Sequence, residues 1–267
     1  MHPLKGLILI VLALSTLIRC NTSNPVDIQE TGQQIGDVMA SMDEMGGNSG
    51  SLAASYAEPT FTRLVSEETE IASYSPTGIR SVACVSADPF STFISFTWAD
   101  GASSCLLSAT GATVSRAPQF TATGRRGATL TVSKTGTYGQ KITKTGADTF
   151  TFSNDGIKRV FAAAGATLFD FTTTTTADIG ITGTARTGRI ISGGTLRVAN
   201  NLTGGTCDYS PTAVTWAASC NCAVSGSWSG SCSDGKTSTM TITGCGTATL
   251  TVGADSESFT FDRCYSI

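Results

Sequence analysis

The sequence predicts an all-β, disulfide-bonded protein, an antiparallel sandwich or flattened barrel, behind a mostly flexible N-terminal spacer that contains a short helix. Two observations predict it: from Pro76 onward apolar residues alternate with Ser and Thr, and the body of the chain is rich in cysteine. Only 14% of the 267 residues are charged, so small hydroxyl side chains supply much of the polar surface. This length suits either one large β domain or two smaller ones.

Each expected strand has one apolar and one hydroxyl-bearing face, as half-buried antiparallel strands do. The apolar members are Ile94, Phe96 and Trp98; Leu130 and Val132; Phe150 and Phe152; Met240 and Ile242; Leu250 and Val252; and Phe259 and Phe261. Asp100-Gly101, Asn154-Asp155-Gly156 and Asp234-Gly235 predict tight hairpins between such runs. Residues 182–198 read as strand material, and the Thr run at 172–176 as a strand or loop.

Residues 21–75 hold nine acidic residues and one base, Arg63, with a Gly-rich break at 46–50, which indicates a largely flexible spacer. Within it, an apolar helical face predicts a short helix, for which Thr31-x-x-Gln34 is the expected capping box. The members of this face are Ile35, Val38, Met39 and Met42. We expect the face to pack on its own domain; the alternative is that it recruits a partner.

The first nineteen residues are typical of an export signal, with Lys5 before a short apolar stretch at 7–17. Leu17-Ile18-Arg19-Cys20 resembles the lipobox of bacterial lipoproteins, although Arg19 stands where Gly, Ala or Ser is usual. The resemblance implies that Cys20 carries lipid such as palmitate and becomes the mature N-terminus. Asn21 is not the Asp of inner-membrane retention, so the outer membrane is favoured, at its periplasmic or surface face. The alternative is cleavage after Ser15, which leaves Cys20 a plain thiol.

The other cysteines form an even set that suits four disulfides in an oxidising compartment. They are Cys84, Cys105, Cys207, Cys220, Cys222, Cys232, Cys245 and Cys264. Cys84 and Cys105 stand far from the rest, so we expect them to pair with each other. Cys220 and Cys222 point to the same side of an extended segment and are expected to reach different partners. A zinc site around Cys220-x-Cys222 is the alternative, with a ligand gap shorter than usual.

The expected organisation is therefore a signal peptide (1–19), a lipid-anchored acidic spacer (20–75) and a β domain (76–267) with a disulfide-rich part (207–267). The only histidine, His2, lies in the signal, which removes His-based triads and zinc sites from the mature chain. We predict no catalytic residue, metal or cofactor. The alternative is a glycan hydrolase with two acids among Asp148, Asp155, Asp170 and Asp178, residue types that more often form turns.

Basic residues gather in the middle of the chain and form a candidate patch for an anionic ligand, such as an acidic glycan or lipid phosphate. They are Arg116, Arg125, Arg126, Lys134, Lys141, Lys144, Lys158 and Arg159. The alternative is that they are solvated strand residues which discourage edge pairing. The formal net charge of −3 argues against nucleic acid as a partner.

The Thr residues at alternate positions in 237–251 resemble the flat faces of some ice-binding proteins, although any strand that shows Thr to water has this pattern and no repeat is visible. Trp98, Trp216 and Trp228 are expected in the core rather than on a sugar platform. The sequence thus predicts an exported, membrane-anchored lipoprotein with a non-enzymatic binding or structural role in the envelope, its partners being the membrane and an envelope glycan or protein. An adhesin or an ice-binding face is a minor alternative.

Overall fold

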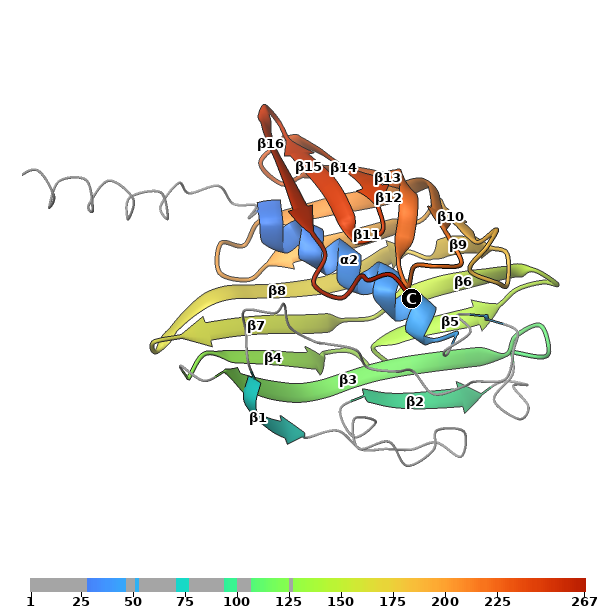
Figure 1. The fold of residues 1–267 in the computed structure, drawn as a ribbon, viewed down its shortest axis with the longest axis horizontal. Helices are drawn as coiled ribbons and strands as arrows, with labels where there is room; N and C mark the ends of the chain where they lie inside the picture. The colour runs from blue at the N-terminus through green and yellow to red at the C-terminus, as the bar shows by residue number, and fades with distance from the viewer. Residues whose placement is uncertain (1–27, 47–50, 53–70, 77–93, 100–106, 125–126) are drawn as a thin grey trace, which may run out of the picture.

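The computed structural model describes residues 28–46, 51–52, 71–76, 94–99, 107–124 and 127–267, and Figure 1 shows their arrangement. These residues form one helix, α2 (Ile28–Glu44), and sixteen strands in a single hydrogen-bonded sheet. The pairings between the strands are antiparallel. The predicted antiparallel β class is therefore confirmed.

The sheet follows a continuous path of neighbouring strands from β10 to β16. In spatial order they are β10 (Ile190–Ser192), β9 (Ile179–Thr182), β6 (Thr149–Asn154), β5 (Gln140–Lys144), β3 (Thr113–Gly124), β4 (Thr129–Lys134), β7 (Ile157–Ala163), β8 (Ala166–Ala177), β11 (Thr195–Asn200), β12 (Thr206–Trp216), β13 (Ala223–Cys232), β14 (Thr237–Gly244), β15 (Thr247–Val252) and β16 (Asp255–Thr260). Two further strands, β1 (Ile71–Pro76) and β2 (Ile94–Ala99), also pair with β3.

The path closes on itself, because β10 pairs with β12 through Ile190↔Thr215 and Ile191↔Val214. Long strands make this possible: β3 pairs with both β4 and β5, and β12 pairs with both β11 and β10. Figure 1 shows β4 and β5 one after the other along the same edge of β3. The sheet is therefore ring-like without being a regular barrel, and β13 to β16 continue it beyond β12.

Helix α2 crosses the sheet diagonally, from β8 and β16 at its N-terminal end toward β5 at its C-terminal end (Figure 1). The predicted apolar face is confirmed as core, since Ile35, Val38, Met39 and Met42 are all buried. The polar side is buried as well, including Thr31, Gln34, Ser41 and Asp43. Where the sequence predicted a largely flexible spacer, residues 28–46 are thus part of the core.

The start of the helix differs from the expected capping box. Because α2 begins at Ile28, Thr31 lies inside its first turns, and Gln34 Nε2 donates to Glu30 Oε1 at 2.6 Å instead. Two glycines inside the helix cost about 1 kcal/mol each in helix propensity. They are needed for packing, because a Cβ at Gly32 would overlap the ring of Phe259, and one at Gly36 the ring of Phe261. Tertiary contacts therefore decide that this segment is helical.

Three disulfides clamp the C-terminal part, as the cysteine count predicted. Cys207 is bonded to Cys232 across β12 and β13, Cys220 to Cys245, and Cys222 to Cys264 in the segment after β16. The prediction that Cys220 and Cys222 reach different partners is confirmed. The expected pair Cys84–Cys105 lies outside the described residues.

The turn predictions met different outcomes. Asp234-Gly235 forms the β13–β14 hairpin, with Lys236 N donating to Asp234 Oδ1 at 3.1 Å. Asn154-Asp155-Gly156 joins β6 to β7, but these strands pair with other neighbours, so the hairpin prediction is wrong there. The Asp155 carboxylate instead accepts the backbone N–H groups of residues 137–139. Asp100-Gly101 lies outside the described residues, and the Thr run at 172–176 belongs to β8.

Candidate functional site

The densest group of ionisable side chains lies between α2 and the sheet, and we refer to it as the helix–arginine network. The helix contributes the carboxylates Glu30, Asp37, Asp43 and Glu44. The rest of the chain contributes guanidinium groups from β3 (Arg116), β7 (Arg159), the segment between β9 and β10 (Arg186 and Arg189) and the segment after β16 (Arg263). Segments far apart in the sequence therefore meet on one helix.

Arg159 reaches the N-terminal half of α2. Its Nη1 lies 2.9 Å from Asp37 Oδ2 and 3.9 Å from Glu30 Oε1, and its Nη2 lies 3.5 Å from Asp262 Oδ2. Burial by itself would lower the pKa of this guanidinium, but the surrounding carboxylates, Asp37 foremost, raise it above its ordinary value. Arg159 is thus held firmly in its charged form.

Asp43 is held by two arginines at the other end of the helix. Arg186 donates to it through Nε at 2.8 Å and through Nη2 at 2.7 Å, and Arg189 through Nη1 at 3.3 Å. Burial raises the pKa of Asp43, and its two arginine partners offset this only in part. Arg189 is 0% exposed, and burial lowers its pKa to about 10, against the opposing charge of Asp43. Neither charge would be tolerated here without the other.

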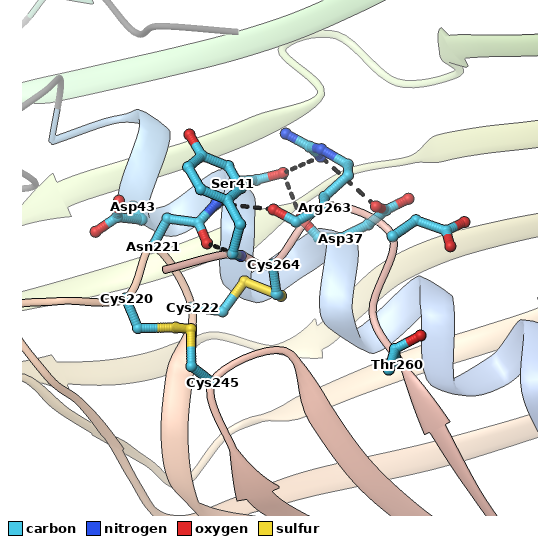
Figure 2. Close-up of a disulfide and its surroundings, with 12 residues drawn as sticks. Asp37, Ser41, Asp43, Cys220, Asn221, Cys222, Cys245, Thr260, Arg263 and Cys264 are labelled. Carbon is cyan, nitrogen blue, oxygen red and sulfur yellow. Dashed lines mark hydrogen bonds and ion pairs between the residues drawn. A yellow bond between two sulfur atoms is a disulfide. The ribbon is translucent and has the colours of Figure 1, made fainter. Parts of the chain in front are cut away.

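Glu44 joins the sheet to the C-terminal segment. Arg116 Nε donates to Glu44 Oε2 at 2.7 Å, and Arg263 donates to the other carboxylate oxygen. Burial by itself would raise the pKa of Glu44, but the charges of Arg116 and Arg263 outweigh it and lower the pKa. Arg263 Nη1 also donates to Ser41 Oγ at 3.4 Å and lies 3.7 Å from Asp37 Oδ1. Figure 2 shows Arg263 beside the Cys222–Cys264 disulfide, with Ser41 and Asp37 on the neighbouring helix.

The network offsets an unfavourable placement of negative charge at the C-terminus of the helix. A helix C-terminus carries partial negative charge, so Asp43 and Glu44 in the last turn are unfavourable there, and the last turn holds no base of its own. The guanidinium groups of Arg116, Arg186, Arg189 and Arg263 gather around these two carboxylates. The helix and the sheet are therefore complementary in charge as well as in shape.

A small cavity of about 30 Å³ lies beside the network and is lined by Gln34, Asp37, Val38, Ser41, Arg116, Phe120, Leu130, Val132, Gln140, Ile157, Arg159, Thr173 and Arg263. Arg159 Nε is buried and has no hydrogen-bond partner among the described groups. The lining guanidinium groups are already neutralised by carboxylates, which leaves no net attraction for an anion. The size and polarity suit about one or two ordered water molecules, and we expect one of them to accept from Arg159 Nε.

The predicted basic patch is not gathered on one surface of the described chain. Arg116 and Arg159 point inward to the network. Lys134 Nζ donates to Thr137 O at 2.6 Å, Lys144 Nζ donates to Leu107 O at 2.9 Å, Lys158 pairs with Asp170 at 3.0 Å, and Lys141 lies 4.4 Å from the ring centroid of Tyr138. Arg125 and Arg126 lie outside the described residues. The sequence did not identify Arg186, Arg189 and Arg263 as partners of the helix carboxylates. The available signal was the helix itself, which has several acidic residues and no basic one and therefore needs basic partners from elsewhere if it is buried.

The four acids considered for a glycan hydrolase do not form a pair directed at a common point. Asp155 accepts from the backbone of 137–139, Asp170 pairs with Lys158 and accepts from Asn201, and Asp148 and Asp178 are exposed at strand ends.

Within the described ranges, no group of three His, Cys, Asp or Glu side chains is arranged to hold a metal ion. In the same ranges, no helix is both long enough and apolar enough to cross a membrane. Trp216 and Trp228 are buried, as expected, whereas the side chain of Trp98 is not described.

The outer side of β13 to β16 carries rows of hydroxyl groups, and we refer to it as the hydroxyl face. Its two central rows are Ser227–Thr241–Thr249–Ser258 and Ser229–Thr239–Thr251–Ser256. Within these rows, Thr249 and Ser258 lie 2.8 Å apart and Thr251 and Ser256 lie 3.0 Å apart, so these hydroxyls are hydrogen-bonded. The opposite side of the same strands holds buried Trp228, Met240 and Leu250.

The fold and the helix–arginine network together define a class of protein: an antiparallel β protein with a ring-like sheet and a helix packed against it. The carboxylates of this helix pair with arginines from the sheet and from the segments outside the strands. Comparison with known protein families, with curated proteins and with solved structures finds no match.

Proposed function

We propose that this chain is an exported protein, anchored to a membrane by lipid on Cys20, with a non-enzymatic binding or structural role in the cell envelope. The observation that carries the proposal is the set of three disulfides, because such bonds persist in oxidising compartments outside the cytosol. The lipobox-like residues 17–20 supply the anchor. The outer membrane is the proposed location.

The helix–arginine network supports a structural role over catalysis. An acid–base or nucleophilic site needs groups with free positions directed at a substrate. Here the carboxylates of α2 and the guanidinium groups around them are directed at one another. These ion pairs hold the helix against the sheet.

Replacing Cys20 by Ala is expected to abolish incorporation of labelled fatty acid and partition into detergent when the full chain is expressed in a Gram-negative host. The physical reason is that the thiol is the acyl acceptor and the chain has no other proposed anchor. Asn21→Ala, which leaves Cys20 in place, is the matched control and should be labelled like the unmodified chain. Equal labelling of the Cys20→Ala chain would contradict the anchor.

The hydroxyl face favours a second candidate function, an adhesin that binds a neutral polyhydroxyl surface such as an insoluble glycan. Hydroxyl groups held in rows offer many weak hydrogen bonds to a repeating polar surface at little cost in side-chain freedom. Thr241→Lys, in the middle of the face, is expected to abolish retention on insoluble glycans, whereas Thr182→Lys, exposed on β9, should not. Retention in growing ice but on no glycan would instead favour an ice-binding face.

A further inference from the structure

The N-terminal part of α2 is held against β7 and β16. Glu30 near the start of the helix is 3.9 Å from Arg159 on β7, and Gln33 Nε2 donates to Thr260 O at the end of β16. Figure 1 shows this end of α2 on the left, with the β7–β8 and β11–β12 turns on the same side. Only eight residue steps separate Cys20 from Ile28, which span at most about 28 Å. An anchor on Cys20 would therefore hold this side of the molecule close to the membrane.

The β7–β8 hairpin exposes a leucine at this end. Phe161 pairs with Phe169 and Ala162 with Thr167, so Leu168 is the extra residue of a β-bulge. Bulges redirect side chains, and Leu168 is 58% exposed. The rings of Phe161 and Phe169 stack with centroids 5.2 Å apart, and this cross-strand contact stabilises the pairing of β7 and β8 next to the bulge.

The β11–β12 turn exposes a second leucine. Asn200 Oδ1 accepts the backbone N–H of Leu202 at 3.0 Å and of Thr203 at 3.3 Å, which fixes the turn and leaves Leu202 51% exposed. Asn201 ties this turn to β8, because its Nδ2 donates to Asp170 Oδ1 at 2.6 Å. Asp170 is two residues from Leu168, so the two leucines project from connected, rigid turns.

We propose that Leu168 and Leu202 form a lipid-facing surface that inserts into the interface of the membrane to which Cys20 is anchored. This inference rests on the proposed lipid anchor. Because the two turns are already fixed by hydrogen bonds, their insertion costs little conformational entropy. Burying each leucine in the membrane removes apolar area from water, which favours insertion. The short distance from the anchor makes the contact intramolecular in effect, so each tip needs only weak affinity of its own.

The test places a Trp reporter at each tip in the full chain, reconstituted into neutral phosphatidylcholine vesicles with brominated acyl chains. Leu168→Trp and Leu202→Trp are each expected to lose about half of their added emission, because Trp settles at the lipid–water interface. Ile190→Trp is the matched control: Ile190 is 40% exposed and follows Arg189, which contacts Asp43 at the other end of α2. Its added emission should be unchanged.

Equal quenching at all three positions, or none at the two tips, would overturn the lipid-facing surface. Failure of the anchor is read separately, from the mass of the peptide that contains Cys20. If that peptide carries no fatty acid, vesicles with a thiol-reactive headgroup attach the chain through Cys20, and the same quenching comparison is made. Quenching confined to the two tips in that arm would support the surface even though the lipid anchor had failed.

Discussion

Replacing Asp43 by Ala is expected to lower the free energy of unfolding by about 3 to 5 kcal/mol, because it leaves buried guanidinium charges without their carboxylate. Arg189 has no exposed surface and meets Asp43 at 3.3 Å, and Arg186 donates to both oxygens of the same carboxylate. Urea unfolding followed by tryptophan fluorescence measures the change, since the guanidinium of Arg189 lies 5.5 Å from the ring centroid of the buried Trp216.

Asp208→Ala is the matched control for this prediction. Arg197 donates to Asp208 twice, at 2.7 Å each, so the geometry resembles that of Arg186 with Asp43. The side chains of Arg197 and Asp208 are 44% and 36% exposed, however, and pairs in water contribute about 0 to 1 kcal/mol. Similar losses for Asp43→Ala and Asp208→Ala would show that burial of the network has no energetic consequence.

Replacing both Cys222 and Cys264 by Ser is expected to lower the free energy of unfolding by about 4 kcal/mol, from the entropy of the loop that the bond closes over a sequence separation of 42. The bond also keeps Arg263 beside α2. Without it, the amides of α2 and of residues 261–267 should exchange with solvent faster, because Arg263 is no longer held against Glu44.

Cys207→Ser with Cys232→Ser gives the comparison, since that bond joins β12 and β13, which are already paired in the sheet. Its loss should cost a similar free energy, with a sequence separation of 25, but the faster exchange should stay within β12 and β13. Unchanged exchange in α2 after loss of Cys222–Cys264 would mean that the disulfide does not support the network.

The alternation of Thr239, Met240 and Thr241 was sufficient to predict a strand and its buried face, because the two sides of a strand are set by its period of two. The different partners of Cys220 and Cys222 followed from the same rule, and the side of α2 that bears Val38 and Met42 followed from the helical period. These are local properties, and each was readable in a short window of residues.

What only the tertiary structure decided is where α2 lies and which groups surround it. Its acidic residues predicted a largely flexible spacer, yet Asp43 is buried and Asp37 and Glu44 are half-buried, each against arginines that lie far away in the sequence. The turn at Asn154-Asp155-Gly156 looked like a hairpin, but β6 and β7 separate to pair with β9 and β8. Burial of a charge depends on a partner brought close by the whole fold, and the choice of strand neighbour depends on closure of the ring, so no local window of the sequence contains either.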